Sequence, residues 1–117
     1  MWHLVYPEVS SKYRRYVILS QAPGLDLFEH VKKFGYFTET TVKPIVIQIL
    51  SIINSIHSKK IIHMDIKPEN ICWGNSPIYN NINPTIKIID FGFVIPEIDR
   101  KRSHIGTYSY ADPTYFP

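Results

Sequence analysis

The chain has 117 residues, enough for one compact domain or for part of a larger one. Hydrophobic residues make up 44% and charged residues 20%, which allows a buried core and excludes global disorder. The net charge of +3 is a mild excess without a basic stripe or a named motif, so nucleic-acid binding is not predicted.

Cysteine content and hydropathy bear on the compartment. The single cysteine, Cys72, excludes an internal disulfide framework and a multi-cysteine zinc site, and it predicts an intracellular, reducing compartment such as the cytoplasm. The N-terminal residues contain no basic region followed by a long apolar core, and polar residues interrupt the most apolar stretch, 45–56. We therefore expect neither a signal peptide nor a membrane span.

The first predicted elements are a hairpin and a short helix. Apolar segments at 3–6 and 14–20 predict two strands, with a turn-prone stretch at 10–12 between them. Asp26 can cap the start of the helix that follows. Glu29 sits three residues further on, as in a capping box, and Gly35 would end the helix.

A longer amphipathic helix and several small strands follow. Seven apolar residues repeat at helical spacing, namely Val42, Ile45, Val46, Ile49, Ile52, Ile53 and Ile56. Pro44 is tolerable there because we expect it to fall in the first turn. Short apolar segments at 61–62, 71–72 and 86–89 predict strands, the last two joined by a connection rich in Asn, Pro and Gly. Small strands beside a long helix predict an α+β fold.

Two motifs in the loops carry the chemistry. Residues 63–70 read HMDIKPEN, and residues 87–92 read KIIDFG, about twenty positions further on. They match the catalytic loop and the metal-binding loop of protein kinases, written H-R-D-L-x-x-x-N and D-F-G. DFG alone is weak evidence, but the octet, two strands and DFG in this order are specific. The chain therefore resembles the eukaryotic-type protein kinase family.

The resemblance covers nearly the whole chain. Residues 16–31, YVILSQAPGLDLFEHV, are similar to the fifth strand, hinge and following helix of a kinase, and residues 106–115, GTYSYADPTY, resemble the end of the activation segment. It implies a partial kinase domain over 1–117, with the last small-lobe strands and the hinge at about 1–22 and the start of the large lobe at 23–117. The five glycines are too scattered for a G-x-G-x-x-G loop, and no VAIK-type lysine precedes the hinge, so we expect a central fragment.

The residue types suit phosphoryl transfer. Attack by a hydroxyl needs a carboxylate close to the attacking oxygen, which makes Asp65 the candidate base or orienting group. Lys67 can reach the same space and neutralise charge on the transferred phosphate. Asn70 and Asp90 supply hard oxygen ligands, as Mg²⁺ bound to ATP phosphates requires.

On the adenine side, the resemblance implies that hinge residues Ser20 to Ala22 offer backbone groups to the base and that Leu19 is the gatekeeper. It further places Cys72 under the adenine and Asp26 beside the ribose. Simpler interpretations stay open. Asp26 can be a helix cap, Cys72 a small buried hydrophobic residue, Asp65 and Asn70 turn residues, and residues 90–92 an ordinary turn after a strand.

Several residues bear on regulation and on the class of kinase. Met64 replaces the arginine of HRD. This implies that position 64 does not bind a phosphate on the activation segment, at Ser103 or Thr107. KPEN after Asp65, together with Thr107, resembles serine/threonine kinases more than tyrosine kinases. Thr114 stands where the family keeps a glutamate.

The resemblance implies transfer of the γ-phosphate of ATP to serine or threonine hydroxyls of proteins, with ATP, Mg²⁺ and a protein substrate as ligands and partners. The alternative is a catalytically inactive truncated remnant or a kinase-derived binding module. A further candidate partner is a chain that supplies the missing lobes. Because phosphate clamping depends on parts not found in this sequence, we expect little phosphotransfer by the 117-residue chain alone.

Overall fold

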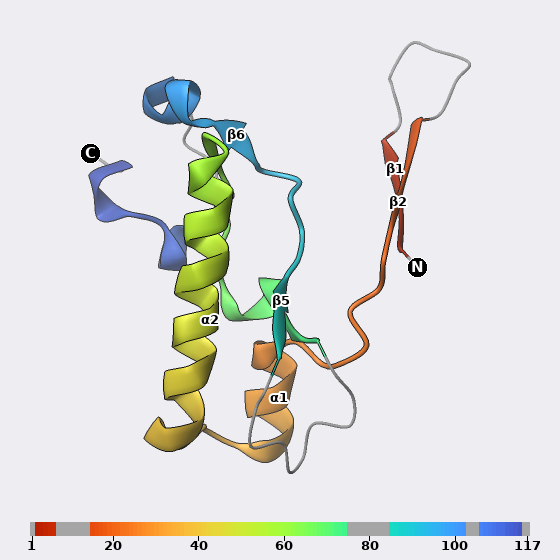
Figure 1. The fold of residues 1–117 in the computed structure, drawn as a ribbon, viewed down its shortest axis with the longest axis vertical. Helices are drawn as coiled ribbons and strands as arrows, with labels where there is room; N and C mark the ends of the chain where they lie inside the picture. The colour runs from red at the N-terminus through yellow and green to blue at the C-terminus, as the bar shows by residue number, and fades with distance from the viewer. Residues whose placement is uncertain (1, 7–14, 75–84, 103–105, 116–117) are drawn as a thin grey trace.

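The computed structural model describes residues 2–6, 15–74, 85–102 and 106–115 (Figure 1). Within these ranges the chain forms two α-helices, three two-stranded antiparallel sheets and four 3₁₀ turns. The α+β prediction is confirmed. The strands are β1 (Trp2–Tyr6), β2 (Arg15–Leu19), β3 (Ile61–Ile62), β4 (Ile71–Trp73), β5 (Ile86–Ile88) and β6 (Ile95–Pro96).

The predicted hairpin and short helix are both present. Strands β1 and β2 pair from Trp2 opposite Leu19 to Tyr6 opposite Arg15, and Figure 1 shows them standing apart from the helices. The predicted turn at 10–12 lies outside the described residues. Helix α1 (Leu27–Phe34) begins after Asp26, whose carboxylate Oδ1 accepts a hydrogen bond from Glu29 N at 2.7 Å. It ends at Gly35, whose φ of 86° suits a residue without a side chain.

Helix α2 (Glu39–Ser58) begins three residues before the predicted apolar repeat. Thr38 Oγ1 accepts a hydrogen bond from Thr41 N at 3.3 Å and so caps its start. Pro44 therefore lies in the second turn, not the first, and the prediction was wrong on this point. Val46, predicted on the core face, is 42% exposed. Ile47 and Leu50 are also exposed, so α2 presents a second apolar stripe away from the core.

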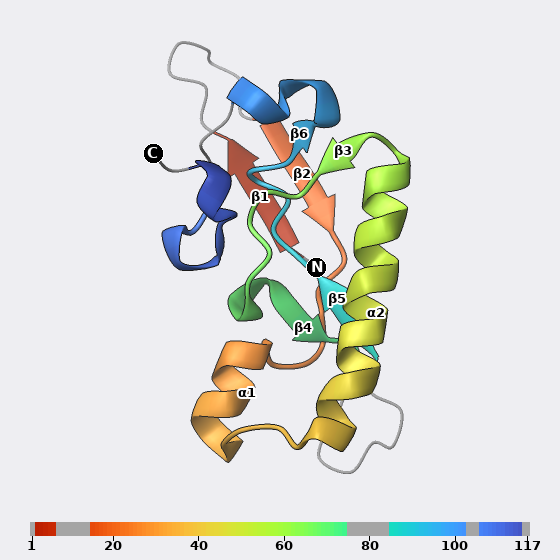
Figure 2. The same cartoon turned by 90° about the vertical axis from the view of Figure 1, so that its left-hand side faces the viewer.

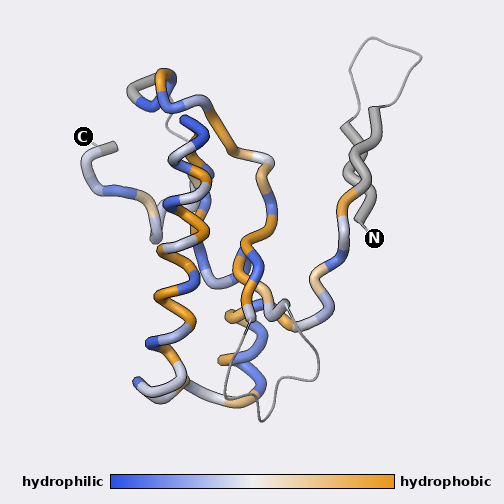
Figure 3. Tube along the Cα trace, viewed as in Figure 1, coloured by the Kyte–Doolittle hydropathy of each residue, from blue (hydrophilic) through white to orange (hydrophobic). Residues whose placement is uncertain are grey.

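The core lies between α1, α2 and the β4–β5 ribbon (Figure 2). Figure 3 shows apolar and polar residues alternating along α2, as an amphipathic helix requires. The buried residues of this cluster are Leu27, Ile45, Ile71, Trp73, Ile86 and Ile88. Strands β4 and β5 lie at the predicted positions and pair antiparallel, with Cys72 opposite Lys87. This ribbon fixes the end of β5, where residues 89–92 begin.

Pairing of β3 with β6 was not predicted. Ile61 lies opposite Pro96 and Ile62 opposite Ile95, in a two-residue ladder that returns the chain from the DFG loop to the end of α2. Pro96 reads locally as a strand breaker, and only the fold places it beside β3. Lys60, with φ of 61°, accepts a hydrogen bond at its carbonyl from Glu97 N at 2.9 Å.

An aromatic cluster around His30 predicts a dependence of stability on pH. Trp73 Nε1 donates to His30 Nδ1 at 3.0 Å, so this nitrogen must be unprotonated, and burial lowers the pKa of His30 below its ordinary value of 6.5. Just below pH 6.5, His30 is therefore protonated in more of the unfolded chains than of the folded ones. The free energy of unfolding should be highest above pH 6.5 and should fall as the pH decreases through the lowered pKa.

Urea denaturation at pH 7.5 and 5.5 measures this effect. His30→Phe should flatten the change between the two values, whereas the matched variant of the exposed His57, His57→Phe, should keep it. An unchanged pH response in His30→Phe would contradict this account.

Candidate active site

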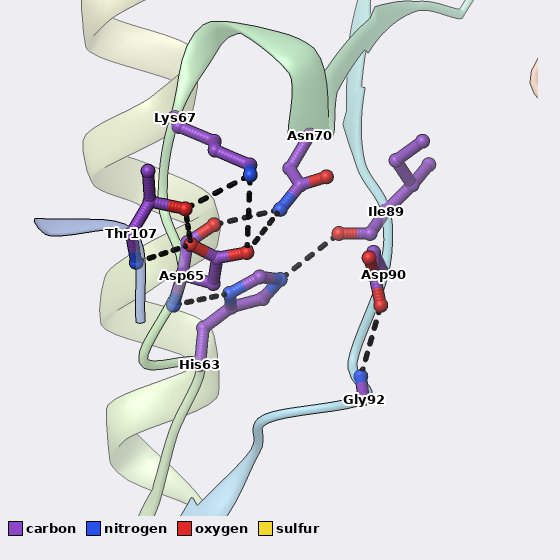
Figure 4. Close-up of polar contacts among 8 residues, drawn as sticks. All are labelled: His63, Asp65, Lys67, Asn70, Ile89, Asp90, Gly92 and Thr107. Atoms are coloured by element: carbon purple, nitrogen blue, oxygen red, sulfur yellow. Dashed lines mark hydrogen bonds and ion pairs between the residues drawn. The ribbon is translucent and has the colours of Figure 1, made fainter. Parts of the chain in front are cut away.

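Asp65 and Asn70 form the centre of the site. Asp65 is 4% exposed, and Asn70, at the end of the 3₁₀ turn Pro68–Asn70, is buried beside it. Asn70 Nδ2 donates to the Asp65 carbonyl at 2.8 Å and to Asp65 Oδ2 at 3.1 Å (Figure 4). The amide nitrogen is thereby used within the loop. The amide oxygen of Asn70 remains as an acceptor for another group.

Thr107, from the C-terminal segment, completes the surroundings of the Asp65 carboxylate. Its backbone N and its Oγ1 both donate to Asp65 Oδ1, at 3.0 and 2.7 Å. Lys67 Nζ donates to Thr107 Oγ1 at 2.9 Å and lies 3.6 Å from Asp65 Oδ2. Both carboxylate oxygens therefore have donors, which offset the cost of burying the charge.

The surroundings keep Asp65 ionised. Burial alone would raise its pKa, but the Thr107 hydroxyl, the positive charge of Lys67, the Thr107 amide and the Asn70 amide together outweigh burial and lower the pKa below its ordinary value. At neutral pH the Asp65 carboxylate is ionised, so it can accept a hydrogen bond or a proton but has no proton to donate.

His63 links the Asp65 loop to the Asp90 loop. Its ring is buried; Asp65 N donates to Nδ1 at 3.2 Å, so the ring proton lies on Nε2, which donates to the Ile89 carbonyl at 2.9 Å. The ring also contacts Phe91 edge to face at 4.9 Å. Both ring nitrogens are occupied, which agrees with a positioning role rather than with proton transfer.

A cavity of about 440 Å³ adjoins this network. Its lining comes from the end of β2 and the segment after it, from the end of the 3₁₀ turn and from β5 with the residues that follow: Leu19, Ser20, Ala22, Asn70, Lys87, Ile88, Ile89, Asp90 and Phe91. Asn70 and Asp90 therefore face one space. Asp90 has φ of 59°, and its Oδ1 accepts from Gly92 N at 3.1 Å, which leaves the second carboxylate oxygen available.

The donors on this cavity fit Mg²⁺ carried by a nucleotide. One amide oxygen and one carboxylate are hard ligands, and Mg²⁺ is commonly held by one or two such groups together with phosphates and waters. Among the described residues, no cluster of three His, Cys, Asp or Glu side chains could hold a metal ion by itself. The residues thus fit a metal that arrives with phosphate oxygens.

The structure separates the predicted site residues into two groups. Leu19, Ser20 and Ala22 line the cavity with Asn70 and Asp90, whereas Asp65 and Lys67 lie in the adjoining hydrogen-bond network.

Asp26 and Cys72 are not among the residues that line the cavity. Asp26 caps α1, and the backbones of the two residues form an isolated bridge. Burial and, secondarily, the charge of Asp26 raise the pKa of the Cys72 thiol, so it is not a reactive nucleophile.

Sequence reasoning missed two features of the site. It noted Thr107 as a class marker and as a position for a phosphate, but not as a partner of Asp65, which Thr107 binds from 42 positions away. It also missed the close approach of Gly106, with φ of 124°, to the Met64 carbonyl. The sequence signal for this approach was Gly106 itself, because a glycine is expected where two backbone segments lie very close together. Ser103 lies outside the described residues.

Replacing Thr107 with valine should raise the pKa of Asp65, because Oδ1 loses its hydroxyl donor. The free energy of unfolding should fall by about 1–3 kcal/mol, as for other buried groups that lose a partner. Carboxyl NMR titration and urea denaturation measure the two effects. Thr114→Val is a matched control, because that hydroxyl bonds the exposed Asp112. A pKa of Asp65 unchanged by Thr107→Val would refute the assignment.

No helix within the described ranges is both long and apolar enough to cross a membrane.

Comparison with known proteins identifies the family. The protein kinase domain profile matches residues 5–115. The chain is 34% identical over 119 residues to an Aurora kinase of Dictyostelium discoideum, covering 95% of this chain and 29% of that protein. It is 40% identical over 110 residues to serine/threonine-protein kinase B of a Synechocystis strain, covering 84% of this chain and 18% of that protein. The chain thus spans less than a third of the length of these two relatives, and it belongs to the protein kinase family.

Proposed function

We propose that this chain carries the ATP-binding and phosphoryl-transfer groups of a serine/threonine protein kinase. Within a complete kinase domain it would transfer the γ-phosphate of ATP to serine or threonine hydroxyls of proteins. The observation that supports this best is the position of Asn70, which is hydrogen-bonded to Asp65 and faces one cavity with Asp90. The Asp65 carboxylate, which would bind the substrate hydroxyl, thus lies next to Asn70 and Asp90, whose oxygens would bind a nucleotide-bound metal.

Each polar residue has a role that suits its surroundings. Asp65, ionised at neutral pH, accepts a hydrogen bond from the attacking hydroxyl, orients it and takes its proton. Lys67, 3.6 Å from that carboxylate, places an ammonium group near the transferred phosphate. Asn70 and Asp90 hold Mg²⁺, which when bound neutralises charge on the phosphates.

The remaining cavity residues suit the adenosine part of ATP. Leu19 and Ala22 supply apolar surface, and the backbone groups of residues 20–22 can pair with the base edge. We further propose Cys72 under the base and Asp26 beside the ribose, although neither residue lines the cavity. Asp26 can serve as a cap and as a ribose contact at once, because Glu29 N uses only one of its carboxylate oxygens.

A catalytically inactive remnant or binding module is the second candidate. The exposed apolar stripe on α2 suits a binding module, because Ile47 and Leu50 are 58% and 60% exposed and offer apolar surface to a partner. A partner chain that supplies the missing lobes would cover such a surface.

Transfer of radiolabelled phosphate from ATP to a basic protein tests the proposal. We expect little transfer by the chain alone and measurable transfer once a polypeptide with a relative's remaining kinase segments is added. Asp65→Asn and Asp90→Asn should abolish it, and Asp112→Asn, at an exposed position away from the cavity, should not. No transfer in the complemented mixture would favour the inactive remnant, and transfer that survives both site variants would contradict the assigned roles.

A further inference from the structure

Lys87 occupies the middle of β5 and faces the cavity. Its neighbours Ile86 and Ile88 are buried in the core, whereas Lys87 is exposed on the opposite face of the strand. It pairs with Cys72 across the ribbon, and Ile89, two residues on, also lines the cavity. Lys87 therefore borders the same space as Asn70 and Asp90.

The described lining of the cavity carries one charge of each sign. Lys87 is the one basic side chain among the described residues that line the cavity, and Asp90 is the one acidic side chain. The described residues place no carboxylate within ion-pair distance of Lys87. Within the described part of the chain, no salt bridge holds its ammonium group, which can therefore meet a ligand in the cavity.

We propose that Lys87 binds a phosphate group of the nucleotide in this cavity. An ammonium group on a flexible stem offers three donors and a compact charge, which suits a phosphate oxygen. It would supply the positive charge that the described lining otherwise lacks before a metal is bound. The inference rests on the proposed function, since it assumes that the cavity admits a nucleotide.

The experiment measures binding by the intact chain, with no added metal, for three probes: ATP, adenosine and inorganic tripolyphosphate. Lys87→Met should weaken ATP and tripolyphosphate roughly tenfold, as expected for a partly exposed charge-assisted contact, and should leave adenosine unchanged. Lys87→Arg should restore most of the loss. Lys43→Met removes the same charge from an exposed position of α2 outside the cavity and should change nothing.

The outcomes separate the two proposals. If neither ATP nor adenosine binds the wild-type chain, the proposed function is contradicted, whatever Lys87 does. If ATP binds and Lys87→Met leaves both ATP and tripolyphosphate unaffected, or weakens adenosine as much as ATP, the role of Lys87 is overturned while the nucleotide site stands. A loss equal to that in Lys43→Met would show a nonspecific charge effect and would also overturn it.

Discussion

Trp73→Ala should lower the free energy of unfolding by about 3–5 kcal/mol, as expected for removal of a large buried aromatic side chain. Trp73 is 2% exposed, packs edge to face on Phe37 at 6.0 Å and donates to His30. Its backbone also joins the ribbon to the segment before α1, because Trp73 N donates to the Leu25 carbonyl at 3.0 Å. The cavity wall depends on this ribbon, so nucleotide binding should be lost as well.

Urea denaturation followed by circular dichroism measures the effect. Tyr36→Ala removes an aromatic side chain that is 89% exposed, and it should change stability by no more than about 0.5 kcal/mol. Equal losses in the two variants would show that the core is not centred on Trp73.

Gly106→Ala should release the C-terminal segment from Asp65. The φ of 124° costs a residue with a side chain about 1–3 kcal/mol. In addition, an added Cβ would overlap the Met64 carbonyl oxygen, which is backbone and cannot turn aside. Thr107 should then withdraw from Asp65, and the pKa of Asp65 should rise.

Gly35→Ala is the matched control for Gly106→Ala. Gly35 also has a positive φ, of 86°, but an added Cβ would meet nothing within 4 Å. This variant should lose stability through backbone strain alone and keep the pKa of Asp65. If Gly106→Ala, like Gly35→Ala, leaves the pKa of Asp65 unchanged, then the contact at Met64 does not hold the segment that carries Thr107.

Local features of the fold could be predicted because their causes are local. Asp26 and Gly35 bound α1 through capping within a few residues, and strands β4 and β5 follow from short apolar segments next to a connection rich in turn residues. The start of α2 was misplaced because the apolar repeat begins after the Thr38 cap. Strand β6 was missed because its pairing partner lies more than thirty positions away.

The same distinction holds for the site. Asp65 and Asn70 lie in one short loop, so their proximity could be expected from sequence, and the DFG motif indicated Asp90. The contact of Thr107 with Asp65 and the place of Lys87 on the cavity wall depend on tertiary arrangement and strand register. Neither has a local sequence pattern from which it could be derived.

Calorimetric binding of ATP with and without Mg²⁺ tests the central claim, that Asn70 and Asp90 form a metal–nucleotide site, most directly. Mg²⁺ should strengthen ATP binding to the wild-type chain, and Asp90→Asn should remove this gain because the carboxylate ligand is lost. Asp112→Asn, an equal change of charge outside the cavity, should retain it. If Mg²⁺ does not raise the affinity of the wild-type chain for ATP, or raises it equally in Asp90→Asn, the proposed metal–nucleotide site is contradicted.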